Sequence, residues 1–184
     1  MLAVARWGLM PSWAKDLSMG ASLINGRSET VLEKPAFRES FRQRRCLIPA
    51  DGFYEWEKNG KAKRPFHFAM KDGSLFGFAG IWDRWRAPDG EWVESCCILT
   101  TAANELLKDV HDRMPAILPR AQYEVWLKTP ADEAERLVDL LAPLDAGVMK
   151  GYAVSSLVNR PQNDSPECAQ EAVSERSGNL ELFG

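Results

Sequence analysis

Histidine is scarce in this sequence, and the cysteines show none of the spacing of a metal site. The chain has two histidines, and no two of its four cysteines are separated by just two residues; these are Cys46, Cys96, Cys97 and Cys168. Tetrahedral zinc sites usually draw on such pairs. We therefore expect no bound metal ion and no cofactor, and thiols that stay reduced inside a cell.

Long apolar runs and the common catalytic signatures are also missing. No run approaches the length of a membrane span, and the N-terminal residues meet Arg6 too soon for a secretion signal. The sequence contains no glycine-rich phosphate loop, no GxSxG serine motif and no HExxH zinc motif. These absences predict a cytoplasmic protein without a membrane partner.

The remaining composition is that of an ordinary globular domain. Of the 184 residues, 45% are hydrophobic and 27% are charged, with a formal net charge of −3. Residues 34–64 are locally basic, with nine basic and four acidic side chains. This stretch is either a solvated helix face followed by a charged hairpin tip, or a rim that faces phosphates.

Hydrophobic periodicity and turn chemistry predict an α+β fold. Short turns such as Lys71-Asp72-Gly73 and Pro88-Asp89-Gly90 favour a curved, mostly antiparallel, barrel-like sheet with peripheral helices. We expect one domain over residues 1–165 and a flexible tail over 166–184. Strands are expected at 2–9, 46–57, 64–70, 75–85, 92–101 and 152–158, and helices at 33–45, 104–110, 120–128 and 131–141.

Glu55 is the first candidate for chemistry. It lies between aromatic neighbours in Phe53-Tyr54-Glu55-Trp56. A carboxylate in apolar surroundings has a raised pKa, which suits proton transfer near neutral pH. The alternative is a strand glutamate that simply faces water. The bend predicted at Asp51-Gly52 favours the first interpretation.

His111, Asn25 and Arg27 are further candidates. His111 opens a loop with Asp112 and Arg113, where it either acts as an acid or base or caps a helix. Asn25 precedes Gly26, which is typical of a turn. The amide could instead orient a reacting group while Arg27 binds a phosphate.

Exposed tryptophans are candidates for stacking against bases. The chain has seven tryptophans, and Trp13 follows Pro11 and Ser12 in an expected loop. We therefore expect Trp13 to offer an open aromatic face. Trp7 is at least as well explained as a plug at the end of a sheet.

Taken together and in order, these segments resemble one family, the SRAP (SOS-response-associated peptidase) proteins. The resemblance covers nearly the whole chain except its last residues. Its motifs are Arg6-Trp7-Gly8, Leu23-Ile24-Asn25-Gly26-Arg27-Ser28-Glu29-Thr30, Cys46-Leu47-Ile48-Pro49-Ala50-Asp51-Gly52-Phe53-Tyr54-Glu55-Trp56, Ile98-Leu99-Thr100-Thr101-Ala102-Ala103, His111-Asp112-Arg113-Met114-Pro115, Val154-Ser155, Val158-Asn159 and Asn163-Asp164.

The resemblance implies an enzyme that acts on abasic sites in single-stranded DNA, as a monomer. Family members crosslink covalently to the opened sugar through an N-terminal cysteine, whose amine forms a Schiff base and whose thiol closes a thiazolidine, with associated autopeptidase and lyase-like chemistry. Asn25 would orient the amine, Glu55 would transfer protons during ring opening and crosslink reversal, and His111 would support acid–base steps. By the same resemblance, phosphates would contact Arg27 and Arg113, and the strand would lie against Trp13.

One departure from the family pattern matters. The family begins Met-Cys-Gly-Arg, whereas Leu2 follows Met1 here and the four cysteines are internal. We expect that the polypeptide as written does not form the thiazolidine. Either its start is misassigned or truncated, or it is a non-catalytic single-stranded DNA-binding module that has lost its nucleophile. An unrelated hydrolase that uses Glu55 and His111 is a third hypothesis.

Overall fold

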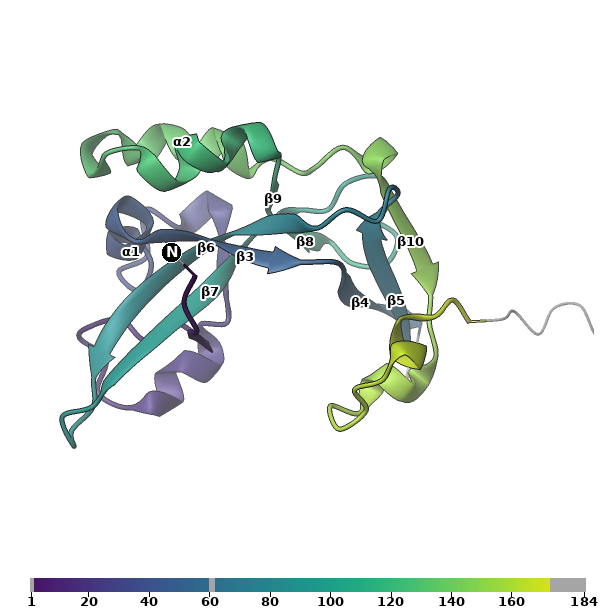
Figure 1. The fold of residues 1–184 in the computed structure, drawn as a ribbon, viewed down its shortest axis with the longest axis horizontal. Coiled ribbons are helices and arrows are strands. Elements are labelled where there is room, and N and C mark those ends of the chain that lie inside the picture. The colour runs from purple at the N-terminus through teal and green to yellow at the C-terminus, as the bar shows by residue number, and fades with distance from the viewer. Residues whose placement is uncertain (1, 60–61, 173–184) are drawn as a thin grey trace, which may run out of the picture.

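The protein folds into two β-sheets with helices on one side (Figure 1). The structure is a computed structural model, and it describes residues 2–59 and 62–172. The larger sheet has the central order β1 (Arg6–Trp7), β7 (Trp92–Ala102), β6 (Phe76–Arg86) and β3 (Arg45–Ala50), with β2 (Asn25–Arg27) and β8 (Arg113–Pro115) paired to β7 and β9 (Ile117–Leu118) paired to β6. The smaller sheet has the order β10 (Met149–Ala153), β5 (Ala62–Met70) and β4 (Phe53–Asn59).

Most strand pairs are antiparallel, and only β1 and β2 run parallel to β7 among the described strands. The predicted α+β class with a mostly antiparallel sheet is confirmed. The barrel-like closure is not seen, because the run expected as one strand over residues 46–57 is broken. It leaves the larger sheet as β3 and enters the smaller sheet as β4.

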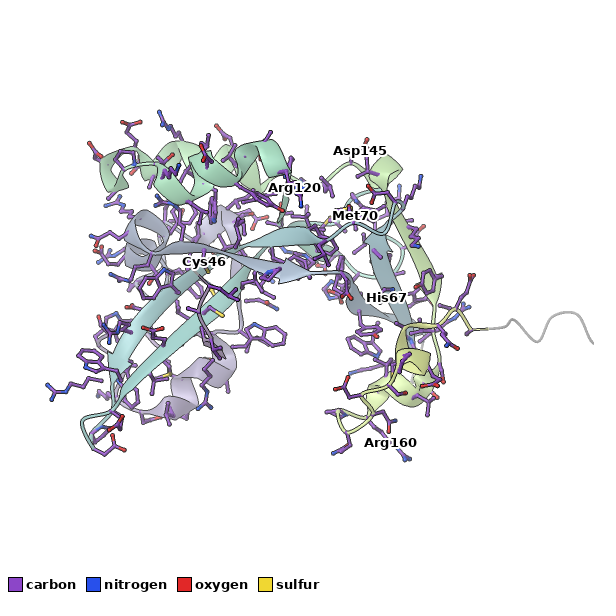
Figure 2. The ribbon with its side chains drawn as sticks, viewed as in Figure 1. Cys46, His67, Met70, Arg120, Asp145 and Arg160 are labelled. Carbon is purple, nitrogen blue, oxygen red and sulfur yellow. The ribbon has the colours of Figure 1, made fainter. Side chains whose placement is uncertain are left out.

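Gly52 makes this change of sheet possible. A Cβ at position 52 would lie 2.2 Å from Nε2 of His67, so no side chain fits there. His67 is held in place because its Nδ1 lies 3.0 Å from the hydroxyl of Tyr152, which donates to the Ala169 carbonyl at 3.0 Å. Figure 2 shows His67 on the smaller sheet, packed at the bend.

Two apolar cores hold the molecule together. One lies between the larger sheet and the helices, where Phe41 of α1 (Arg38–Gln43) meets Trp126 of α2 (Tyr123–Lys128) edge to face at 5.6 Å. The other joins the two sheets: Phe53 of β4 stacks on Phe68 of β5 and contacts Phe78 of β6 edge to face. The second core fixes how the sheets face one another.

Arg45 ties both α-helices to the start of β3. Its buried guanidinium donates to the carbonyls of Phe41 and Arg42 at the end of α1, and to those of Trp126 and Thr129 at the end of α2. The last carbonyls of a helix lack partners within the helix, and a cation complements the dipole there. One side chain therefore caps two helix ends.

The helices are shorter than the sequence predicts. The segment 33–45 is α-helical only over Arg38–Gln43, and residues 131–141 form a 3₁₀ helix. Residues 105–110 form turns and no α-helix, because so short a segment gains few helical hydrogen bonds for the cost of starting a helix. The Asn104 side-chain oxygen caps these turns by accepting from the amides of Leu106 and Leu107 at 3.1 Å. The strand expected at 2–9 is limited to Arg6–Trp7, since Gly8 has a φ of +117°.

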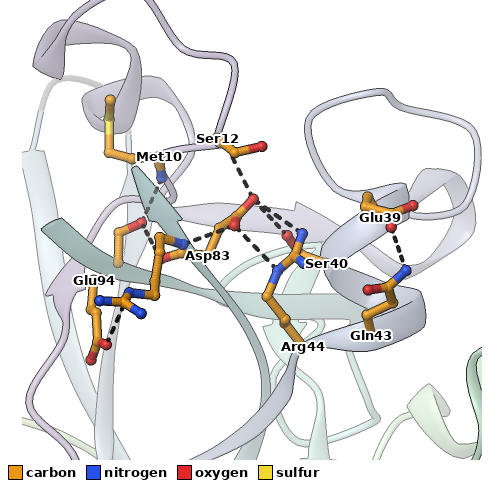
Figure 3. A network of polar contacts seen from close by, with 10 residues as sticks. Met10, Ser12, Glu39, Ser40, Gln43, Arg44, Asp83 and Glu94 are labelled. Atoms are coloured by element: carbon orange, nitrogen blue, oxygen red, sulfur yellow. Dashed lines mark hydrogen bonds and ion pairs between the residues drawn. The ribbon is translucent and has the colours of Figure 1, made fainter. Parts of the chain in front are cut away.

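Buried Asp83 anchors the loop that follows β1. Its carboxylate pairs with Arg44 at 3.2 Å and accepts hydrogen bonds from Ser40 and the Ser12 amide, as Figure 3 shows. Nearby, the Met10 amide donates to Ser95 at 2.7 Å. The loop is therefore held to the sheet at two points, the amide of Met10 and the amide of Ser12.

The chain continues past residue 165 in contact with the smaller sheet. Pro166–Ala169 form a 3₁₀ helix with Cys168 buried, and the Ala172 amide donates to Ala153 at 2.8 Å. The rest of the expected tail, residues 173–184, lies outside the described residues. No described helix is long and apolar enough to cross a membrane.

Candidate functional site

A cleft of about 700 Å³ lies where the two sheets meet. Five of the six residues singled out from the sequence line it, and they come from three strands and one loop. They are Asn25, Arg27, Glu55, His111 and Arg113. Residues far apart in the sequence therefore present an amide, a carboxyl group, an imidazole and two guanidinium groups to one space.

Glu55 reaches the cleft from the smaller sheet. Side chains alternate along β4, so Glu55 shares a face with Phe53, which belongs to the core between the sheets. This placement half-buries the carboxyl group. Burial raises the pKa of Glu55, and the nearby His111 opposes this shift. A carboxyl group of this kind can hold a proton at a higher pH than an exposed glutamate.

His111 is oriented by its own loop. Its Nδ1 accepts from the Arg113 amide at 3.0 Å and lies 3.1 Å from the Arg113 carbonyl, with the Asp112 carboxylate at 3.4 Å. When Nδ1 accepts, the neutral ring carries its proton on Nε2. When the ring is charged, the carbonyl and carboxylate can receive the new N–H. The loop thus fixes the orientation of the ring.

Arg113 is engaged by the protein itself. Its guanidinium binds both carboxylate oxygens of Glu29, at 2.6 and 3.0 Å, and donates to the Thr100 carbonyl at 2.6 Å. The expected phosphate contact stays a prediction, and a phosphate there would have to share Arg113 with Glu29. The observed contacts fix the strand that follows His111.

Asn25 and Arg27 are placed by parallel pairing with the central strand. Asn25 lies opposite Ile98 and Arg27 opposite Thr100, so both project from the same face of the sheet. Asn25 is therefore part of a strand and not the turn that Asn-Gly favours. Arg27 is exposed and forms no ion pair with any residue that the structure describes. Its guanidinium is available to an anion.

Of the two candidate tryptophans, Trp13 is exposed as expected, whereas Trp7 is not a buried plug. Trp7 lines the cleft, is 57% exposed, and donates from its ring nitrogen to the Ile24 carbonyl at 2.8 Å. Trp13 is 55% exposed but is not among the residues that line the cleft. Its role beside the DNA strand stays a prediction.

Several cleft residues were not singled out from the sequence. The parallel pairing of Trp7 with Cys96 places the Trp7 ring beside the cleft, and no local pattern announces it. Thr100 on β7 is the register partner of Arg27 on β2 and of Pro115 on β8. Among the described residues, no group of three or more acidic, histidine or cysteine side chains could hold a metal ion.

Comparison with known proteins identifies the family. Residues 1–161 match the model of the family described as SOS response associated peptidase (SRAP).

The chain belongs to the SRAP family.

Its relatives include the abasic site processing protein YoqW of Bacillus subtilis, 47% identical over 167 residues, which cover 90% of this chain and 75% of that protein. The abasic site processing protein HMCES of Mus musculus is 33% identical over 198 residues, covering 91% of this chain and 56% of that protein. Among solved structures, a protein from Bacteroides thetaiotaomicron superposes with a TM-score of 0.82 at 35% identity, covering 91% of this chain and 75% of that one. Another, from Bordetella bronchiseptica, gives 0.73 at 34% identity, covering 83% and 77%. The resemblance drawn from the sequence motifs is confirmed.

Proposed function

We propose that this SRAP protein recognises abasic sites in single-stranded DNA and acts on the opened sugar in the cleft. The observation that carries the proposal is the convergence of Asn25, Glu55 and His111 on one cleft, with Arg27 exposed at its edge. The names of the SRAP relatives YoqW and HMCES, both abasic site processing proteins, support it. Action as a monomer and in the cytoplasm stay predictions.

The roles follow from the chemistry of each group. Opening the sugar ring moves a proton from a hydroxyl to the ring oxygen, and the carboxyl group of Glu55 and the imidazole of His111 are groups that can relay it. The Asn25 amide can donate to one reacting group and accept from another, and so orient an amine. Arg27 would hold a flanking phosphate, because a guanidinium matches phosphate geometry.

The thiols of Cys46, Cys96 and Cys97 are poor nucleophiles, and no cysteine is among the residues that line the cleft. Burial raises the pKa of Cys46 to about 12, and it also raises the pKa values of Cys96 and Cys97. A protonated thiol does not attack an aldehyde or imine. A covalent step therefore needs a different group, and the family resemblance assigns it to the amine and thiol of an N-terminal cysteine. Non-covalent recognition alone is the second candidate function.

Two measurements on the same oligonucleotides test these proposals. The protein is titrated into a single strand with one abasic site and into the matched intact strand. We expect at least tenfold tighter binding of the abasic strand, and equal binding would overturn the proposal. Borohydride is then added, because it reduces an imine to a stable adduct. An adduct with the abasic strand alone would establish covalent capture, whereas preferential binding without an adduct would establish the binding-module function.

A further inference from the structure

One face of the β6–β7 hairpin continues from the cleft to the hairpin tip. The register pairs Trp82 with Cys96, Arg84 with Glu94 and Arg86 with Trp92, and cross-strand partners project from the same face. Ile98 and Thr100, which line the cleft, lie on this face of β7. The alternate residues, such as Ser95 and Cys97, are buried. The hairpin is therefore covered on one face and open on the other.

The open face carries aromatic rings flanked by arginines. Trp92 is 54% exposed, and the guanidinium carbons of Arg84 and Arg86 lie 4.7 and 5.9 Å from the centre of its ring. Trp7, the register partner of Cys96, adds a second exposed aromatic ring where this face reaches the cleft. The two exposed rings and the two guanidinium groups thus form one continuous stretch of surface and are not scattered singly. Stacked guanidinium groups are also held in place before any ligand arrives.

We propose that this face binds the part of a single DNA strand that extends beyond the cleft, with a base stacked near Trp92 and phosphates paired with Arg84 and Arg86. The inference rests on the proposed function, because it extends the same strand outward. Exposed aromatics interleaved with cations are the pattern that single-stranded nucleic acids require. Trp92 lies four residues along β7 from Cys96, which is about 13 Å at strand spacing.

The acidic side chain on this face does not prevent such binding. Glu94 lies 3.5 Å from Arg84, and both side chains are substantially exposed, at 43% and 50%. Figure 3 labels Glu94 and marks its ion pair with a dashed line. An exposed ion pair contributes little stability, so a phosphate can replace Glu94 as the partner of Arg84. Arg86 adds a second cation beside the same ring.

The test compares a short and a long abasic strand, of about 4 and about 16 nucleotides, bound to the whole protein. We expect Trp92→Ala to weaken binding of the long strand about tenfold and to leave the short strand unchanged. Trp92→Phe should retain most of the affinity. The double variant Arg84→Gln, Arg86→Gln should reduce the slope of log affinity against log salt by about 1 for the long strand.

Arg42→Gln is the matched control. Arg42 has an exposed ion pair with Glu135, at 3.1 Å, but it lies on α1 against the other face of the sheet. We expect it to change neither affinity nor slope, and thermal melting checks that every variant is folded. If the wild type prefers abasic DNA and Trp92→Ala alters neither strand, this inference alone fails. A change in self-association without a change in DNA binding would overturn it in favour of an interface between copies. If the wild type binds neither strand, the proposed function fails as well.

Discussion

The guanidinium of Arg113 grips the carboxylate of Glu29 through two contacts of 2.6 and 3.0 Å, although the two residues are 84 positions apart. The pair links the segment after Asn25 and Arg27 to the segment after His111. Arg113 is also bonded to the Thr100 carbonyl on the central strand between them. The segments that carry Asn25 and His111, both on the side of the larger sheet, are therefore held to the same strand by one side chain.

Glu29→Gln tests what this pair does. The change removes a bidentate, charge-assisted contact, so we expect a loss of about 1 kcal/mol in the free energy of unfolding. It also removes a negative charge and releases Arg113, so affinity for single-stranded DNA should rise and its salt dependence should steepen. Urea unfolding and salt titrations measure the two effects. Weaker DNA binding with an unchanged salt slope would show that Arg113 only positions the loop of His111. Glu105→Gln, which breaks an exposed pair with Lys108, is the control.

Glu55→Gln should stabilise the folded protein at pH 8 and at the same time impair its action on abasic DNA. Because burial raises the pKa of Glu55, the folded protein holds this proton at pH values where the unfolded chain has lost it. Stability then falls as pH rises from the ordinary glutamate pKa through the raised one, and the cost persists above it. We expect the variant to be more stable than the wild type at pH 8, equal to it at pH 4, and impaired in acting on abasic DNA.

Urea unfolding at the two pH values provides the measurement. Glu57→Gln is the control, since Glu57 lies on the same face of β4. If Glu57→Gln raised the free energy of unfolding at pH 8 as much as Glu55→Gln does, the gain would come from removing any negative charge and not from the burial of Glu55. A loss of stability in Glu55→Gln at pH 8 would assign Glu55 a structural role.

Arg45→Met should destabilise the protein strongly. Methionine fills similar space but leaves carbonyls at the ends of α1 and α2 without their donor. We expect a loss of about 3 kcal/mol, because several hydrogen bonds to a charged group disappear together. Arg42→Met, on the exposed side of α1, should cost far less. Equal losses in the two variants would refute the double capping role.

The sequence predicts the strands better than it predicts how they assemble. The turns at Asp72-Gly73 and Asp89-Gly90 carry local chemistry, so β5, β6 and β7 lie close to their expected ranges. Only the second turn closes a hairpin, because β5 and β6 belong to different sheets. The division into two sheets depends on contact between Gly52 and His67, which no local pattern contains.

Candidate residues could be named from the sequence because their chemistry is unusual for their positions. Glu55 between aromatic residues and His111 in a charged loop both lie at the cleft. The exposed fraction of the side chain does not show which of Trp7 and Trp13 lines the cleft, because the two fractions are nearly equal. What separates them is the parallel pairing of β1 with β7, a long-range register that local periodicity does not encode.

The amide of Asn25 and the acid of Glu55 belong to different sheets, and the aromatic contacts of Phe53 with Phe68 and Phe78 set how those sheets meet. The distance between these two polar groups therefore depends on side chains of the apolar core. Substituting those side chains changes that distance. A conservative change at Phe78 can therefore shift the two sheets relative to one another while leaving every polar group of the cleft in place. Because Phe53 and Phe78 also line the cleft, such a change alters both the alignment of the sheets and the apolar wall that a ligand would meet.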